Sequence, residues 1–294
     1  MEHAEALQPQ TRAFGARGRT VAAHVTMLVV VLAVLWGLWE GWHWIGTRFQ
    51  LTWPFAVNDV TMPHLHRIVQ ALFQPAQVNG PWLIDILWHA ALFTAKESAV
   101  GFALGAVIGF AIAVVLSESR FLERGFIPYI VASQTIPLLA IAPMVVVGLG
   151  SKGVKDWLSV SVLAAYLTFF PVTINALRGL QAADPRAVEL MQSYAAGRWR
   201  ILWKLRVPAS LPFLFSAFRI AAPLSIVGAI ISEPAASIQG GLGGAIVNFN
   251  QYYSIEPQEL WATNIIAALL GIAFFLAVVG VEKAVVRRAP EHVA

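Results

Sequence analysis

The sequence contains no cysteine among its 294 residues. Disulfide bonds, thiol nucleophiles and cysteine-based metal sites are therefore excluded. It also lacks the G-x-x-x-x-G-K-[ST] order of a P-loop, because the glycine-rich segment 148–153 does not follow that pattern. No Ser-His-Asp or His-Glu-x-x-His arrangement is present. We therefore predict that the chain is not an enzyme, has no catalytic residues or cofactor, and neither binds nor hydrolyses ATP itself.

Charged residues are scarce, at 12% of the chain, whereas 58% of the residues are hydrophobic. Soluble domains average about 25% charged residues, so these charges are too few to cover the surface of a globule of this size. The uncharged runs are long enough to cross a bilayer, which takes roughly 20 apolar residues. The composition predicts an all-α, polytopic bundle of transmembrane helices.

The hydrophobic runs predict about six spans. They lie at residues 21–45, 98–117, 126–149, 157–177, 213–231 and 260–281. Residues 1–20 form a polar, basic tail, and residues 46–92 form a mixed segment with several prolines. This segment is predicted to be an external loop with one or two interfacial helices, from the amphipathic pieces at about 65–73 and 82–93. Residues 93–288 then make up the transmembrane core, which includes a long charged loop at 180–212.

The distribution of basic residues predicts the orientation. With the N-terminus inside, 14 of the 20 lysines and arginines lie in cytoplasmic segments and 5 in external ones. Such an excess favours the side that stays in the cytoplasm. We expect a multi-pass protein of the bacterial plasma (inner) membrane with both termini in the cytoplasm. The net charge of +4 reports this orientation and not nucleic-acid binding.

Two histidines in the external segment, His64 and His66, are spaced like a metal-binding pair. Metal sites in proteins use three or four ligands. The sequence offers no third ligand beside this pair, so we predict solvated loop histidines and no metal site.

The second predicted span carries a stripe of small residues. Gly101, Gly105, Gly109 and Ala113 are four residues apart and share one helix face. Small residues on one face let another helix backbone approach closely. Static helix packing and a moving helix–helix contact are both compatible with this stripe, and static packing is the favoured interpretation.

The third predicted span is interrupted by Pro128, Pro137 and Pro143, with three polar residues, Ser133, Gln134 and Thr135, in its middle. Breaks of this kind persist in lipid where neighbouring helices or a water-lined cavity satisfy the backbone. We predict that the polar triplet, together with Asn175 in the fourth span, lines a solute pathway. Hydrogen bonding between helices without contact to a solute is the alternative.

Ionisable residues are rare within the spans. No paired carboxylates are evident there, and Arg219 is the clearest charged residue inside a span. Arg219 and Glu233 are fourteen residues apart, about 21 Å along a helix, so they cannot pair directly. Arg219 is predicted either to orient its helix by reaching the cytoplasmic interface or to act in gating. This scarcity argues against the alternative function class, a partner-free secondary transporter or intramembrane enzyme.

The charged loop 180–212 is the strongest functional signal. Asp184-Pro185 is typical of a helix start, with a capping side chain followed by proline at the first helical position. A short helix over 185–194, a turn at 195–197 and a second amphipathic helix ended by Pro208 would form a helix–turn–helix. It would insert into a soluble cytoplasmic partner, or else lie on the membrane surface without one.

This loop resembles the EAA loop of permease subunits in bacterial ATP-binding cassette importers. When the pattern E-A-A, three residues, G, nine residues, I-x-L-P is anchored on Pro208, Glu189 occupies its first position. Leu190 and Met191 replace the two alanines and Ala195 replaces the glycine, so Gly197 is an alternative for the turn. The position of the turn therefore stays open.

The resemblance covers about residues 90–285. Segments 134–143, 208–212 and 241–243, with Arg219 and Glu233, are similar to motifs of the nitrate/sulfonate/taurine-type permeases. It implies the permease subunit of an importer, working as a homodimer in membrane lipid with two ATP-binding subunits, which hydrolyse ATP, and an external solute-binding protein. The cargo implied is a small solute: a vitamin-like heterocycle of the riboflavin or thiamine-precursor kind, or a sulfonate, nitrate or taurine-like solute. The implied coupling residues are Glu189, Leu190, Ser193, Tyr194, Ala195 and Arg198, with Gly197 as a hinge.

Overall fold

The computed structural model describes residues 10–50, 56–77 and 79–286. The chain forms two compact units, residues 1–70 and residues 71–294. Every named element in the described residues is a helix, and a single isolated β-bridge joins Pro75 and Trp82. The all-α prediction is confirmed.

The described part of the first unit contains α1 (Gln10–Arg48) and most of α2 (Leu65–Leu72), whose last two residues fall in the second unit. Within α1, Val29–Arg48 is long and apolar enough to cross a membrane. The helix begins at Gln10, eleven residues before the predicted span, so residues 10–20 of the expected tail are helical, whereas residues 1–9 lie outside the described part of the chain. Helix α2 covers the amphipathic segment expected in the external loop.

Residues 56–64 pack against the C-terminal end of α1. The approach at Gly46 is so close that an added Cβ would lie 2.5 Å from the Cβ of Val57. Trp39 donates its indole N–H to the carbonyl oxygen of Pro63 at 3.1 Å. Met62 and Ile68 are also buried. This part of the predicted external loop is therefore folded onto its own helix.

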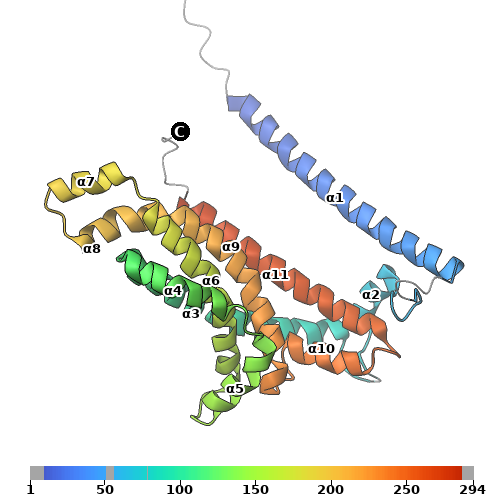
Figure 1. The fold of residues 1–294 in the computed structure, drawn as a ribbon. Coiled ribbons are helices and arrows are strands. Elements are labelled where there is room, and N and C mark those ends of the chain that lie inside the picture. Colours follow the sequence, from blue (N-terminus) through green and yellow to red (C-terminus); the bar gives the residue numbers. More distant parts are fainter. Residues whose placement is uncertain (1–9, 51–55, 78, 287–294) are drawn as a thin grey trace, which may run out of the picture. The chain divides into compact units, whose positions relative to one another are not determined.

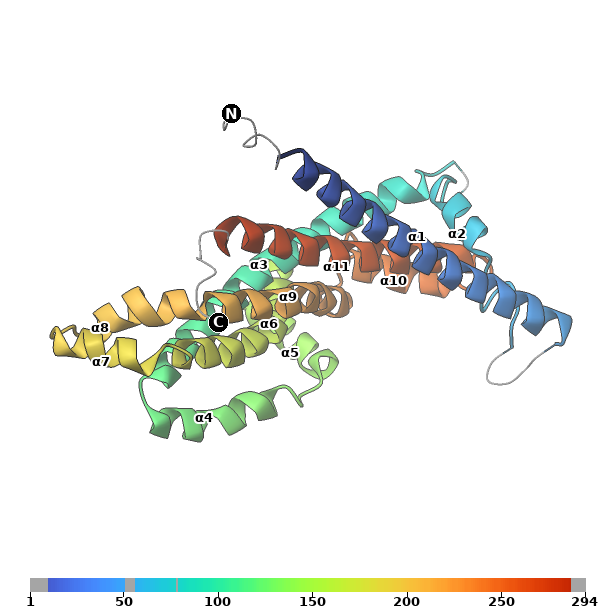
Figure 2. The same cartoon turned by 90° about the horizontal axis from the view of Figure 1, so that it is seen from above.

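The second unit is a helical bundle in which α7 and α8 project beyond one end, while α5 and α10 lie toward the other (Figures 1 and 2). Its helices are α3 (Leu83–Ser117), α4 (Arg120–Ser133), α5 (Leu138–Gly150), α6 (Asp156–Gln181), α7 (Pro185–Ser193), α8 (Arg198–Ile201), α9 (Val207–Ser232), α10 (Leu242–Gln251) and α11 (Pro257–Val286).

Five helical segments of the described chain are long and apolar enough to cross a membrane, and the bent pair α4–α5 makes a sixth if it counts as one span. This agrees with the prediction of about six spans. The second and third spans differ from the prediction as follows. Helix α3 begins at Leu83, because the expected interfacial helix at 82–93 runs directly into the second span. The third span is two helices bent by 96° after Ser133, where the proline at position 137 interrupts the helix.

The glycine stripe of α3 packs against α6. A Cβ added at Gly101 would lie 2.5 Å from the Cβ of Ala164, and one added at Gly105 would lie 2.6 Å from the carbonyl oxygen of Ala165. Ala164 also contacts α9, where a Cβ added at Gly228 would lie 2.9 Å from its Cα. The predicted close approach of a second helix backbone is confirmed, and α3, α6 and α9 form the centre of the bundle.

Candidate functional site

The charged loop forms the predicted helix–turn–helix. Helix α7 begins as expected, because Asp184 caps it by accepting the backbone N–H of Arg186 at 2.9 Å, and Pro185 follows at the first helical position. Proline there has no N–H that needs a partner. The start of the loop could therefore be predicted from two residues.

The turn between α7 and α8 is at Ala195. Its φ is +55°, in the left-handed region, and its N–H bonds to the carbonyl of Gln192 at 2.9 Å. The N–H of Ala196 bonds to the carbonyl of Met191 at 3.0 Å, which completes a Schellman motif. Gly197 has φ −67° and stands at the start of α8. The left-handed residue is thus the one that the family pattern places in its glycine position.

The second helix of the loop does not end at Pro208, contrary to the sequence prediction. Helix α8 continues through a π-helical turn, Leu202–Arg206, into α9. In this turn the N–H of Val207 bonds to the carbonyl of Leu202, five residues back. The wider turn accommodates the missing N–H and the bulk of the proline ring without breaking the helix. The loop is therefore continuous with a membrane span.

The surface of this loop is exposed and partly apolar. Tyr194 is 78% exposed and Trp199 is 70% exposed, and Leu190 and Trp203 are also largely exposed. Large apolar side chains in solvent are typical of a surface that a partner or a membrane covers. The exposed predicted coupling residues are Glu189, Leu190, Ser193, Tyr194, Ala195, Gly197 and Arg198. The structure thus places all seven on the projecting hairpin.

A cavity of about 610 Å³ lies beside α7. It is lined by Arg120 and Arg124 from the first turns of α4, and by Glu189 and Arg206 from the loop. Arg206 also lies 3.7 Å from Glu118, in the turn that joins α3 and α4. One ion pair therefore joins the charged loop to this turn.

The four residues predicted to line the solute pathway lie in two separate parts of the bundle. Ser133 lies at the bend between α4 and α5, where its carbonyl oxygen accepts the Tyr166 hydroxyl of α6, and the Gln134 amide nitrogen is buried without an acceptor among the described residues. The Thr135 hydroxyl bonds to the Ala132 carbonyl. Asn175 is nine residues beyond Tyr166, about 13 Å further along α6. The triplet is together, but Asn175 is not beside it.

Asn175 also has a local partner. Its side-chain N–H bonds to the carbonyl of Pro171, one turn earlier in α6, at 2.8 Å. That bond satisfies the amide within its own helix.

One buried polar cluster contradicts the expectation that no carboxylates pair within the spans. Glu97 of α3 and Glu233 at the end of α9 are both fully buried and lie close to each other, although neither carboxylate oxygen of Glu97 makes a hydrogen bond within the described residues. Glu233 accepts hydrogen bonds from the Thr94 hydroxyl and the Gly243 N–H, both at 2.5 Å. Thr94 in turn accepts the N–H of Leu242 at 2.9 Å. The cluster satisfies the first backbone N–H groups of α10, which have no partners within that helix.

Close contacts with neighbouring atoms explain why glycine, and no larger residue, occupies positions 241 and 243 near this cluster. A Cβ added at Gly241 would lie 2.3 Å from the carboxyl carbon of Glu233, and one at Gly243 would lie 2.1 Å from the carbonyl oxygen of Ile230. The G-L-G segment is therefore what lets the Glu233 carboxylate reach the start of α10. The pairing with Glu97 has no local sequence signal, since the two residues come from distant spans.

Arg219 has a partner that the sequence analysis missed. Its Nε lies 2.7 Å from Glu282 Oε2 of α11, and its Nη2 bonds to the same oxygen. Since α9 and α11 are neighbouring antiparallel spans, an arginine near the start of one and a glutamate near the end of the other meet at the same depth. The position of Glu282 near the end of the last span was therefore the feature of the sequence from which this ion pair could have been predicted.

Residues 105–289 match the model of one protein family, which is described as the binding-protein-dependent transport system inner membrane component. This match covers more than half of the chain. The chain belongs to that family of permeases.

Individual proteins that are similar to this permease are also transport permeases. It is 33% identical over 184 residues to the formylaminopyrimidine transport permease protein of Halalkalibacterium halodurans, covering 63% of this chain and 71% of that protein. It is 29% identical to the riboflavin transport system permease protein of Chloroflexus aurantiacus, covering 55% and 59% of the two chains. The taurine transport system permease protein of Escherichia coli is 22% identical and matches over 92% of both chains.

A solved structure shows the same fold. The crystal structure of an amino acid ABC transporter with histidines superposes with a TM-score of 0.52 at 17% identity, covering 70% of this permease and 95% of that chain. Family and fold together identify a transmembrane permease subunit of an ATP-binding cassette importer, a multi-pass inner-membrane protein that works with ATP-binding subunits and a solute-binding protein. The partner-free transporter or enzyme is thereby set aside.

Proposed function

We propose that two copies of this permease form the pathway of an importer whose ATP is hydrolysed by two partner subunits docked on the 180–212 loops. The observation that carries the proposal is the projecting hairpin α7–α8, whose exposed surface is continuous through the π-helical turn with α9. A partner that moves this hairpin moves a membrane span directly. The EAA-like register supports the same assignment.

The docking surface combines apolar and charged groups. Leu190 and Tyr194 lie one turn apart on α7 and expose 58% and 78% of their surfaces. Glu189 and Arg198 flank them with opposite charges, and both are exposed. Interfaces of this kind have an apolar centre with aromatic anchors and a polar rim. The alternative membrane-surface role explains the exposed tryptophans but not the resemblance of the loop to the EAA pattern.

The proposed homodimer would cover surfaces that one chain leaves open. Helix α4 has no buried residue within the described chain, and Phe121 and Tyr129 on it are 84% and 75% exposed. The polar triplet 133–135 lies at the end of this helix. A second copy packed near α4 would enclose the triplet in a pathway between the two chains, while lipid covers the remaining apolar surface.

Both termini are proposed to lie in the cytoplasm. The 14-to-5 excess of basic residues supports this orientation, and it puts the hairpin α7–α8 on the side that contains ATP.

The cargo is proposed to be a nitrogen heterocycle, since the formylaminopyrimidine and riboflavin permeases are 33% and 29% identical to this chain. Taurine-like, sulfonate and nitrate solutes are the alternatives, from relatives that are 22–28% identical.

The docking surface can be tested by reversing its charges. The permease is produced with the ATP-binding subunit of its own transporter, and the double variant Glu189→Lys/Arg198→Glu is compared with the unchanged chain. We expect the variant to stay in the membrane but to lose both co-purification of the ATP-binding subunit and transport-coupled ATP hydrolysis. Retention of the complex with normal transport would disprove the docking assignment.

A matched control reverses two exposed charges at the opposite end of the bundle, with Lys152→Glu and Glu256→Lys. This control variant is expected to co-purify with the ATP-binding subunit as the unchanged chain does.

Co-purification of two differently tagged copies of the permease tests the homodimer. Uptake of a labelled aminopyrimidine, with riboflavin, taurine and nitrate as competitors, tests the cargo, and competition by taurine or nitrate alone would contradict the heterocycle assignment.

A further inference from the structure

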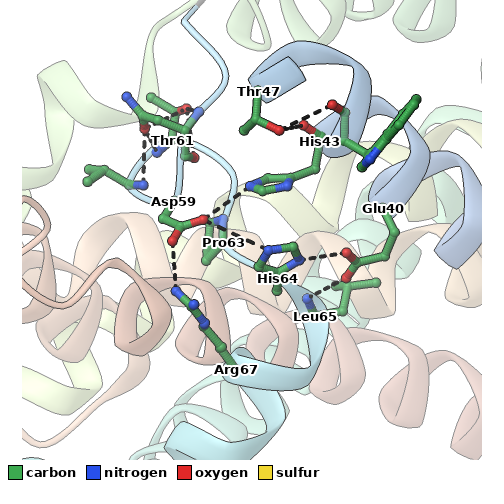
Figure 3. A network of polar contacts seen from close by, with 12 residues as sticks. Glu40, His43, Thr47, Asp59, Thr61, Pro63, His64, Leu65 and Arg67 are labelled. Atoms are coloured by element: carbon green, nitrogen blue, oxygen red, sulfur yellow. Dashed lines mark hydrogen bonds and ion pairs between the residues drawn. The ribbon is translucent and has the colours of Figure 1, made fainter. Parts of the chain in front are cut away.

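A cluster of titratable side chains in the first unit is not explained by the permease function. It lies at the C-terminal end of α1, outside the residues 105–289 that the family model matches. Glu40 and His43 come from α1, Asp59 and His64 from the segment before α2, and Arg67 from the first turn of α2 (Figure 3). The sequence offered no third ligand beside His64 and His66, but the fold brings ligands from more than twenty residues upstream.

Three ligand atoms converge on one point. The Nε2 atom of His43 is 3.2 Å from Oδ1 of Asp59, and the Nε2 atom of His64 is 4.0 Å from the same oxygen. The two imidazole rings are 4.1 Å apart between centroids. Zinc binds nitrogen and carboxylate oxygen at about 2.0–2.2 Å in a tetrahedral arrangement, which requires ligand atoms about 3.3 Å apart. The observed spacing is close to what a bound ion needs.

The surrounding contacts orient these atoms. The Nδ1 atom of His64 lies 2.6 Å from Oε2 of Glu40, and the other oxygen of Glu40 accepts the Leu65 N–H at 3.2 Å. A histidine whose Nδ1–H donates to a carboxylate leaves the lone pair of Nε2 free for a metal. Arg67 holds Oδ2 of Asp59 at 2.8 Å and so leaves Oδ1 facing the histidines. Both ligands are thus held by a second partner, as in metal sites.

A cation also resolves a conflict in this arrangement. With its proton on Nδ1, His64 presents a lone pair at Nε2 to an anionic carboxylate oxygen 4.0 Å away. Two electron-rich atoms at this distance repel each other, and a cation bound between them would remove the repulsion. A doubly protonated His64, paired with both acids and without any metal, is the competing arrangement, and the experiment below separates the two.

We propose that His43, Asp59 and His64 bind a divalent transition-metal ion, with Zn²⁺ the ion that best fits two imidazoles and one carboxylate. Water would occupy the fourth position, as in zinc sites with three protein ligands. His43 is 5% exposed and is fixed in α1, whereas the alternative ligand His66 is exposed on α2. The ion would join the end of α1 to the 56–67 segment and so fix this segment in place.

The test uses the full chain, purified in detergent with an affinity tag that contains no histidine and stripped with a chelator. Zn²⁺ binding is measured by calorimetry, and Co²⁺ is added as a spectroscopic probe. We expect one ion per chain, visible absorption bands typical of tetrahedral Co²⁺, and a rise in the unfolding temperature that EDTA reverses. Each of His43→Gln, Asp59→Asn and His64→Gln should abolish this binding.

Second-sphere and control variants sharpen the result. Glu40→Gln should weaken the affinity by about 10–100-fold, as is typical when a carboxylate that orients a ligand histidine is removed. His89→Gln is the matched control, because His89 is exposed on α3 and lies outside the cluster. Its metal binding should equal that of the unchanged chain, and so should that of His66→Gln.

Several outcomes would overturn the proposal. If the unchanged chain binds no stoichiometric metal and shows no Co²⁺ bands, the cluster is an ion-pair network only. If His66→Gln loses binding while His43→Gln keeps it, the assigned ligands are wrong. The spectrum of the unchanged chain decides the matter even if a ligand variant fails to fold.

Discussion

At Ala195, a residue with a Cβ occupies a backbone conformation that favours glycine. Its φ of +55° is imposed by the Schellman hydrogen bonds at the end of α7. The sequence alone could not choose between Ala195 and Gly197 for the turn, because glycine two residues away satisfies the same local preference. The hydrogen bonds of the folded loop place the turn at Ala195.

Replacing this residue tests the assignment. Ala195→Gly removes the steric cost of a left-handed Cβ, about 1 kcal/mol, and should raise the unfolding temperature of the purified permease. Gly197→Ala is the control, since its φ is −67° and no atom lies within 4 Å of an added Cβ. It should change the unfolding temperature little. A lower unfolding temperature for Ala195→Gly would contradict the observed turn.

The Arg219–Glu282 pair can be tested with a double-mutant cycle. Glu282 is 16% exposed in its side chain, so Glu282→Ala leaves Arg219 without its carboxylate and should destabilise the permease by about 1–3 kcal/mol. Arg219→Ala should do the same, and the double variant should cost less than the sum of the two. Denaturant unfolding in detergent measures all three. Strict additivity would show that the pair contributes no coupling.

At the scale of helices, hydrophobic runs predicted that spans exist but not where they end. Pro208 was expected to end a helix, yet the π-helical turn before it carries the helix on into α9. The segment 82–93 was expected to lie at the interface, yet it is the first part of α3. In both cases the chain continues as a helix beyond a local signal that predicted a boundary, because tertiary context can override local propensity.

The start of α10 depends on a side chain from α3. Thr94→Val keeps the shape but removes the acceptor for the Leu242 N–H and the donor to Glu233, and should cost about 2–3 kcal/mol of unfolding free energy. Thr173→Val is the matched control, since that buried hydroxyl bonds only to the Phe169 carbonyl of its own helix. Its effect should be smaller. Equal effects would show that the α10 contacts add no stability.

The contact between α3 and α6 can be tested in the same way. Gly105→Ala places a Cβ 2.6 Å from the Ala165 carbonyl oxygen, so the helices must separate, at a cost of about 1–3 kcal/mol. Gly271→Ala on α11 meets open space and should be neutral or slightly stabilising through its higher helix propensity. Thermal unfolding of both variants measures the difference. A neutral Gly105→Ala would mean that the contact is loose.

At the scale of the whole molecule, the absence of cysteine makes orientation directly measurable. Tyr194→Cys and Ile255→Cys would each introduce the sole thiol, at residues that are 78% and 76% exposed. With both termini in the cytoplasm, a membrane-impermeant maleimide applied to spheroplasts should label position 255 but not 194, and inside-out vesicles should reverse this result. The opposite labelling would invert the proposed topology.

The helical bundle and the helix–turn–helix at 180–212 could be predicted from the sequence, because hydrophobic runs, caps and short motifs encode these features locally. The buried hydrogen bonds between Thr94, Glu233 and the start of α10, and the cluster around His64, could not be predicted in this way. Thr94 and Glu233 are 139 positions apart, and Glu40 and His64 are 24 apart. Contacts of this kind depend on which helices become neighbours, which no single segment specifies.

The continuous helix from Arg198 to Ala236 has a mechanical consequence. Its 39 residues correspond to about 58 Å at the α-helical rise, and they include a π-helical turn and, inside α9, the prolines Pro212 and Pro223. Close contacts at Gly179 and Gly228 hold this helix against α6 at two places along its length. A displacement of the hairpin should therefore be passed to α6 and α9 together.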